Sequence, residues 1–164
     1  MNIDEYGFDE LLQAAAKAEV NSREVYEYLS NRSGNFVMKD RFRFLANEEQ
    51  KHEELVRDIY EKWSDEELEI PEETPVPIPF IRYDEDTDES EIISQAMNAE
   101  VASRDFYKDM AEKAENEEKS EAIGLLNYLA EMEQNHYDIL KSELGRIKEF
   151  EEFDEYYPAM HLGP

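Results

Sequence analysis

Residues 45–52 read LANEEQKH and residues 129–136 read LAEMEQNH, and these two stretches decide both the fold and the chemistry of the chain. In each stretch a histidine follows a glutamate by three residues. The two pairs are Glu49 with His52 and Glu133 with His136. Residues three positions apart share one face of an α-helix, roughly one turn from each other. Each pair is therefore expected to direct a carboxylate and an imidazole toward the same point.

Apolar residues surround these pairs at alternating steps of three and four, which is the pattern of one helix face. Two further segments show the same pattern, and their apolar faces are interrupted at the same depth by Glu19 and Glu100. Ser33-Gly34-Asn35 and the polar stretch 115–118 break the two halves of the chain. We therefore predict four helices, over residues 9–32, 36–63, 89–114 and 118–149.

The two halves of the chain form an internal repeat. Moving 81 residues along the chain aligns Glu19 with Glu100 and Tyr26 with Tyr107. Moving 84 residues aligns each Glu-x-x-His pair with the other. Two copies of one helix pair are thus expected to bring equivalent residues to the same level.

The segment 64–88 separates the two halves, and Pro71, Pro75, Pro77 and Pro79 exclude a helix there. Asp88, followed by Glu91, is expected to cap the third helix. Two short turns and one long crossover fit an all-α, ferritin-like bundle running up-down-down-up. We expect residues 1–150 to form this bundle and residues 151–164 a C-terminal tail, in which His161 is no ligand.

Composition excludes several classes of function. The 164 residues include 43 acidic and 17 basic ones, for a net charge of −26, and no cysteine. Such a chain lacks the basic face that nucleic acids and anionic membranes require. It has no thiolate for a metal or a disulfide. No apolar run of about 18 residues and no signal sequence are present, so we expect a cytoplasmic protein without a membrane partner.

Four glutamates and two histidines on apolar helix faces need a shared explanation. An unpaired carboxylate in a core is costly, and chains avoid it unless something compensates. Carboxylate oxygen and imidazole nitrogen suit divalent iron, manganese or zinc. Two such ions, about 3.5–4 Å apart as in two-metal sites, would balance the four carboxylate charges.

The complete set resembles the ligand pattern of ferritin-like di-iron carboxylate proteins. The strings 19–26 with 49–52, and 100–107 with 133–136, resemble the rubrerythrin branch most closely. The resemblance implies two iron ions (Fe²⁺/Fe³⁺), replaceable by manganese or zinc, and reduction of hydrogen peroxide or dioxygen. The implied ligands are Glu19, Glu49, His52, Glu100, Glu133 and His136. The implied bridges between the ions are Glu49 and Glu133, and Tyr26 and Tyr107 would hydrogen-bond ligand carboxylates.

Two departures from the rubrerythrin pattern affect these expectations. Rubrerythrins usually carry a second glutamate three residues after the third-helix ligand, and here Ser103 occupies that position. Full-length members also carry a rubredoxin-like domain with four cysteines, and this chain has none. We therefore expect an external electron donor, either a rubredoxin-like protein or a small reductant, and a homodimer whose subunits could exchange helices.

Other interpretations remain open at the level of sequence. The chain could oxidise and store iron, or detoxify it, or it could be a metal-free interaction bundle whose carboxylates face a wet cavity or a partner. The tyrosines could simply fill the core. Arg23 and Arg104 could pair with surface acids. The surplus negative charge fits a solvated surface, attraction of Fe²⁺ or a salty cytoplasm.

Overall fold

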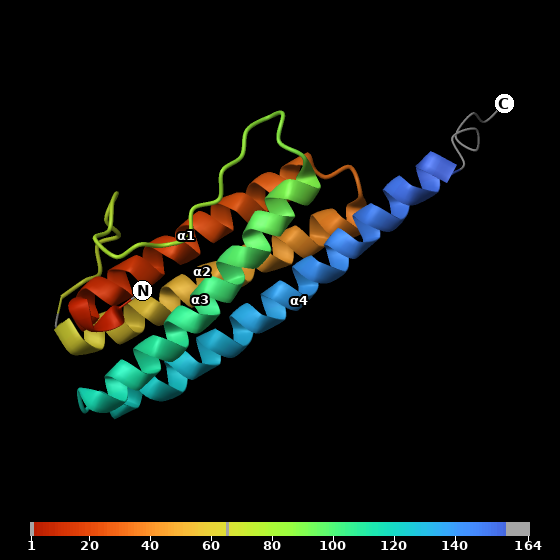
Figure 1. The fold of residues 1–164 in the computed structure, drawn as a ribbon. Coiled ribbons are helices and arrows are strands. Elements are labelled where there is room, and N and C mark those ends of the chain that lie inside the picture. The colour runs from red at the N-terminus through yellow and green to blue at the C-terminus, as the bar shows by residue number, and fades with distance from the viewer. Residues whose placement is uncertain (1, 65, 157–164) are drawn as a thin grey trace.

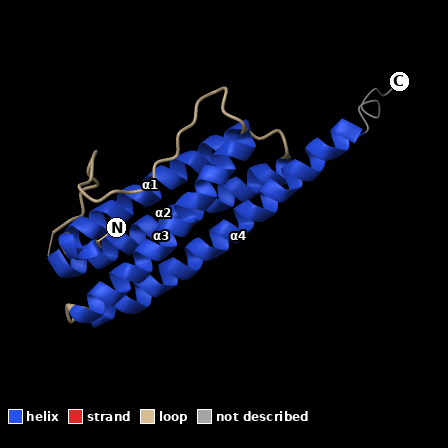
Figure 2. Cartoon of the chain, in the orientation of Figure 1, coloured by secondary structure: helices blue, strands red, loops and turns tan. Residues whose placement is uncertain are grey.

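The structure, a computed structural model, describes residues 2–64 and 66–156, and of 150–156 only the backbone. Four long α-helices make up most of it, preceded by the short 3-10 helix η1 (Ile3–Glu5). The four helices are α1 (Phe8–Arg32), α2 (Phe36–Ser64), α3 (Glu89–Asn116) and α4 (Ser120–Tyr156). The described residues contain no strand, as Figure 2 shows, which confirms the all-α prediction.

The helices form an up-down-down-up bundle (Figure 1). α1 and α2 are one antiparallel hairpin, and α3 and α4 are the second. The crossover between α2 and α3 returns along the whole bundle, so these two helices run in the same direction. The predicted ferritin-like bundle with its long second connection is therefore confirmed.

Two hydrophobic clusters fill the bundle, one toward each end. One cluster includes Leu12, Val56 and Leu126, and the other includes Phe42 and Ile93. Full burial of an aliphatic or aromatic side chain of this size stabilises a fold by roughly 1.5–3 kcal/mol. Between the clusters lies one layer of buried polar residues.

The C-terminal end of α4 differs most from the prediction. α4 continues to Tyr156 instead of residue 149, so the predicted boundary at residue 150 falls inside a helix. Residues 157–164, and with them His161, lie outside the described part of the chain. The extension follows from the local sequence, because the first obstacle to a helix is Pro158, which disfavours helical backbone in the residue before it.

The start of α3 is placed correctly by the sequence, but its cap is not the predicted one. Asp88 occupies the N-cap position, and its side chain makes no capping hydrogen bond. Its backbone carbonyl instead accepts hydrogen bonds from the Glu91 and Ile92 amides, at 3.0 and 3.1 Å.

The second half of the crossover is fastened over α1 and α3. The Tyr28 hydroxyl donates to the Asp84 carbonyl at 3.0 Å. The Gln95 side chain accepts from the Arg82 amide at 2.9 Å and donates to the Arg82 carbonyl at 3.1 Å. A proline-rich segment cannot satisfy its backbone polar groups by hydrogen bonds within itself. These side chains of α1 and α3 supply the hydrogen-bond partners instead.

Candidate metal centre

Each of the four helices contributes to the buried polar layer. α1 and α3 each provide one glutamate, and α2 and α4 each provide a glutamate and a histidine. These residues are Glu19, Glu100, Glu49, His52, Glu133 and His136, the six predicted from the sequence. The most exposed of them, Glu19, shows only 3% of its surface to solvent. The structure therefore brings together all six predicted ligands.

Both histidines turn the Nδ1 atom toward carboxylates of the layer. The Nδ1 atom of His52 lies 3.0 Å from Glu133, 3.3 Å from Glu49 and 3.6 Å from Glu19. The Nδ1 atom of His136 lies 3.1 Å from Glu49, 3.6 Å from Glu133 and 3.8 Å from Glu100. Two sets of donors thus form around the two imidazoles.

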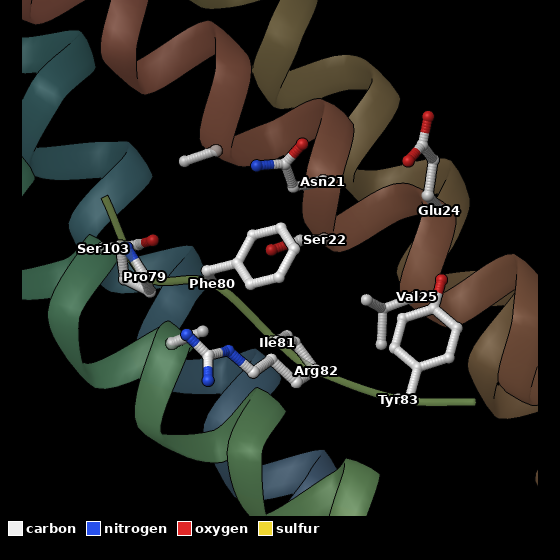
Figure 3. Close-up of a pocket in the computed structure, with 12 residues that line it drawn as sticks. Asn21, Ser22, Glu24, Val25, Pro79, Phe80, Ile81, Arg82, Tyr83 and Ser103 are labelled. Atoms are coloured by element: carbon white, nitrogen blue, oxygen red, sulfur yellow. The ribbon is translucent and has the colours of Figure 1, made fainter. Parts of the chain in front are cut away.

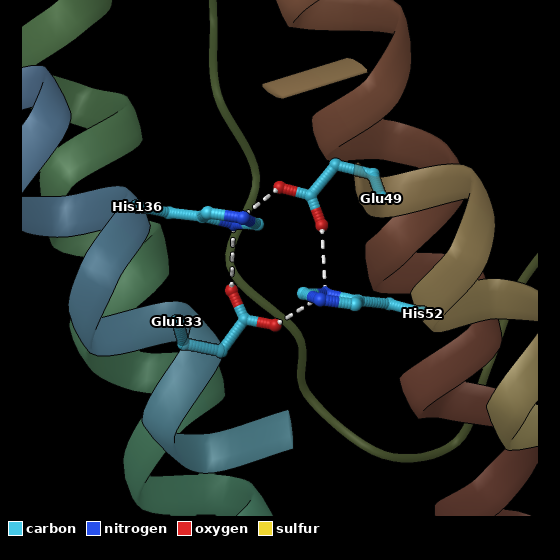
Figure 4. Close-up of side chains that lie close together, drawn as sticks. All are labelled: Glu49, His52, Glu133 and His136. Atoms are coloured by element: carbon cyan, nitrogen blue, oxygen red, sulfur yellow. Dashed lines mark ion pairs between the residues drawn. The ribbon is translucent and has the colours of Figure 1, made fainter. Parts of the chain in front are cut away.

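The two sets share Glu49 and Glu133. Glu49 presents Oε2 to His52 and Oε1 to His136, and Glu133 presents Oε1 to His52 and Oε2 to His136 (Figure 4). One ligand atom from each of these four residues lies within 4.8 Å of the others. A bridging carboxylate needs this placement, so the geometry fits the predicted roles of Glu49 and Glu133.

Several polar atoms of the layer have no hydrogen-bond partner. They include both oxygens of Glu49 and both ring nitrogens of His52 and His136. The Nδ1–carboxylate approaches are close enough for ion pairs but lack the direction of hydrogen bonds. Buried polar groups are seldom left unpaired. Nitrogen and oxygen donors that converge without satisfying one another fit divalent cations of the iron, manganese or zinc type.

Two tyrosines cross the bundle to reach the layer. The Tyr26 hydroxyl of α1 donates to Glu100 of α3, and the Tyr107 hydroxyl of α3 donates to Glu19 of α1. Burial, together with the charge of the accepting carboxylate, raises the pKa of each tyrosine well above its ordinary value. Both hydroxyls therefore stay protonated and act as donors, in addition to filling the core.

The carboxylates of the layer separate into two classes by pKa. Burial and the charges of Glu133 and Glu49 raise the pKa of Glu19 and Glu100 well above the ordinary value. Burial opposes ionisation of Glu49 and Glu133 as well. The neighbouring histidines outweigh the effect of burial on both residues, and Glu100 adds to their effect on Glu133. The pKa values of Glu49 and Glu133 are therefore lowered.

The histidines carry the compensating positive charge. Burial opposes protonation of His136, but the nearby Glu49 and Glu133 raise its pKa to about 10. Burial also opposes protonation of His52, and Glu133, Glu19 and Glu49 raise its pKa far above the usual range. The two histidines therefore offset negative charge of the buried carboxylates in the metal-free layer.

Arginines beside the centre tie each hairpin together. Arg23 of α1 contacts Glu53 of α2 at 2.8 Å, and Arg104 of α3 donates to Gln134 of α4 at 2.6 Å. The sequence left pairing with surface acids open, and Arg104 does contact the exposed Asp105 at 2.7 Å. The contacts to the neighbouring helix were not predicted. The signal was the repeat itself, because Arg23 and Arg104 are equivalent and each follows a predicted ligand by four residues.

A further buried carboxylate was not predicted at all. Glu143 of α4 is 1% exposed and lies 2.9 Å from Arg146 and 3.9 Å from Arg41. It is absent from the repeat, and its neighbours are cations, so it belongs to a structural ion pair. The arginine three residues later was the one sequence signal for it.

Comparisons with known proteins agree with this geometry. The profile of the family described as Rubrerythrin matches residues 10–144. The chain is similar to the solved structure of a hypothetical protein, Pfu-1136390-001, from Pyrococcus furiosus. The sequence identity is 33%, the TM-score is 0.75, and 91% of this chain and 95% of that chain are covered.

A second solved structure, described as ferritin like, diiron-carboxylate proteins from Bacillus anthracis str. Ames, shares the fold. Its identity is 22% and its TM-score 0.68, with 88% of this chain and 99% of that chain covered. A comparison with curated protein sequences gives no match. Within residues 2–64 and 66–156, no helix has the length and apolar character needed to cross a membrane.

Proposed function

The chain belongs to the rubrerythrin family, and from this premise we propose that it is an oxidoreductase that reduces hydrogen peroxide or dioxygen at a di-iron centre. One observation carries the proposal. Glu49 and Glu133 each present one oxygen to each histidine, so one buried layer offers two adjoining sets of nitrogen and oxygen donors. Two-metal centres need shared ligands of this kind.

The residues divide into two groups of ligands. Glu19 and His52 would hold one ion, Glu100 and His136 the other, and Glu49 and Glu133 would bridge them. When bound, two ferrous ions supply the two electrons that, with two protons, convert one hydrogen peroxide into two waters. Iron, manganese and zinc all accept this donor set, and we propose iron as the working metal.

The protein groups around the ligands fix the carboxylates and exclude water. Tyr26 and Tyr107 donate to Glu100 and Glu19, and these hydrogen bonds hold each terminal carboxylate in a defined orientation. The hydrophobic clusters on both sides keep the layer dry, which strengthens electrostatic interactions within it. We propose that electrons return from an external donor, a rubredoxin-like protein or a small reductant.

The test is iron content and reactivity of purified protein. We expect two iron ions per chain and oxidation of bound ferrous iron by hydrogen peroxide, followed by absorbance in a stopped-flow instrument. Glu49→Gln keeps the shape of the side chain and removes its charge, so metal binding and oxidation should both fall. Glu54→Gln, exposed on the same helix, serves as the control. Wild-type protein that folds and binds no transition metal would contradict the proposal.

Iron oxidation coupled to storage or detoxification is the second candidate. The net charge of −26 favours it, because a strongly negative surface concentrates Fe²⁺ around the protein. Storage requires a closed shell of many subunits, whereas the peroxidase function requires at most a small oligomer such as the expected homodimer. Light scattering distinguishes the two, since a shell has many times the mass of a dimer.

A further inference from the structure

An open cavity of about 470 Å³ lies under residues 79–83 of the crossover, over the seam between α1 and α3 (Figure 3). Its lining includes Asn21 and Ser22 of α1, Ser103 of α3, and Phe80 and Arg82 of the crossover. A second cavity of about 310 Å³ shares Ser103 with the first. Both cavities therefore open onto the same seam.

Two small side chains of the cavity lining neighbour the metal centre along the chain. Ser22 follows Glu19 by three residues, and Ser103 follows Glu100 by three residues. On a helix such pairs are neighbours on one face. Ser22 and Ser103 thus line the cavity and neighbour the two terminal carboxylates on their helices, and we call these two serines the inner wall.

Packed side chains enclose the centre along the bundle axis. The two hydrophobic clusters block both directions along the bundle axis. The imidazole rings of His52 of α2 and His136 of α4 stack at 5.1 Å between ring centres. Within each hairpin the helices pack closely along their length. The two cavities lie over the seam between α1 and α3, the helices that carry Glu19 and Glu100.

We propose that the cavity under the crossover is the entrance to the metal centre, and that the inner wall admits hydrogen peroxide while excluding bulkier peroxides. The proposal rests on the proposed function. The cavity is far larger than the roughly 30 Å³ that a water molecule occupies in the liquid, so it admits molecules of this size freely. The inner wall therefore performs the selection by size. The hydroxyls of Ser22 and Ser103 can also form hydrogen bonds with the oxidant.

The test fills the inner wall with larger side chains. Ser103→Leu and Ser22→Leu should each slow oxidation of bound ferrous iron by hydrogen peroxide at least about tenfold. They should also slow uptake of Co²⁺ by metal-free protein, followed by its visible absorption. Ser142→Leu, an identical substitution at an exposed position of α4, should match wild type in both. In wild type, tert-butyl hydroperoxide should react far more slowly than hydrogen peroxide.

The final Co²⁺ absorption shows whether a variant has kept the centre intact. If leucine alters that absorption, Ser103→Val, which adds fewer atoms, replaces it. If a variant slows iron oxidation or Co²⁺ uptake and still reaches the final Co²⁺ absorption of wild type, the result supports the proposed entrance. If both processes run at the wild-type rate, the proposal is overturned. Failure of the proposed function looks different. In that case wild-type protein would not react with hydrogen peroxide at all, while Co²⁺ uptake would still test the entrance.

Discussion

Tyr107 and Glu19 illustrate how single residues shape the centre. The Tyr107 hydroxyl fixes a carboxylate of the opposite hairpin, so Tyr107→Phe leaves Glu19 free to rotate. Loss of such a partner typically lowers metal affinity about 10- to 100-fold, and we expect Co²⁺ affinity to fall in that range. Competition with a chromogenic chelator measures it. Tyr128→Phe, at an exposed tyrosine of α4, is the control and should leave affinity unchanged.

Proton release is the second expectation at the residue scale. The raised pKa values of both histidines, and of Glu19 and Glu100, favour the protonated forms of these groups in the metal-free layer. Metal ligation requires neutral imidazole and ionised carboxylate, so filling both sites should release protons. Calorimetry of Co²⁺ binding in buffers of different ionisation enthalpy counts them. Binding without net proton release would show that the layer is ionised differently.

The same groups set the pH dependence of stability. The pKa of His136 in the folded chain, about 10, exceeds the unfolded value of 6.5. Its stabilising contribution is therefore complete below pH 6.5 and is lost as pH rises through about 10. Metal-free protein should melt at a lower temperature at pH 10 than at pH 7, measured by circular dichroism. Metal-loaded protein should change less, since its imidazoles are already neutral.

Among the elements, the turn between α3 and α4 offers a test of backbone strain. Glu118 has a φ of 59°, in the left-handed region, while the Lys119 amide donates to the Ala114 carbonyl at 2.8 Å. Glycine adopts this conformation without steric cost, so Glu118→Gly should raise the free energy of unfolding by about 1 kcal/mol. Urea denaturation measures the change.

The matched control lies three residues earlier. Glu115 is exposed in the last turn of α3, where glycine loses helix propensity. Glu115→Gly should therefore lower the free energy of unfolding by up to about 1 kcal/mol. Equal effects of the two substitutions would refute the strain at Glu118.

The elements also show what a sequence can predict. The four helices and the shared level of Glu19 and Glu100 follow from spacing along the chain, which is local information. Three features depend instead on competition between weak local preferences and distant contacts. They are the end of α4, the absent side-chain cap at Asp88 and the path of the crossover. The same holds within the site. The resemblance indicated that Tyr26 hydrogen-bonds a ligand carboxylate across the site, and the packed bundle identifies that carboxylate as Glu100 of the other hairpin.

At the scale of the whole molecule, metal should be a major source of stability. A cation present at a thousand times its dissociation constant stabilises the folded state by about 4 kcal/mol. In a protein of this size that corresponds to a rise of about 10 °C in melting temperature. Differential scanning calorimetry with Co²⁺ and with excess chelator checks this. An unchanged Tm after chelation would instead favour the metal-free interaction bundle.

The two cavities beside the crossover have one further consequence. Asn21, Ser22, Glu24 and Val25 line the larger cavity, and the residues 81 positions later, Ala102, Ser103, Asp105 and Phe106, line the smaller one. The repeat has therefore produced two cavities with unequal linings. The larger has the amide of Asn21 where the smaller has the methyl group of Ala102, and the aliphatic Val25 where the smaller has the aromatic Phe106. A nearly symmetric bundle thus presents two chemically different surfaces at equivalent positions of α1 and α3.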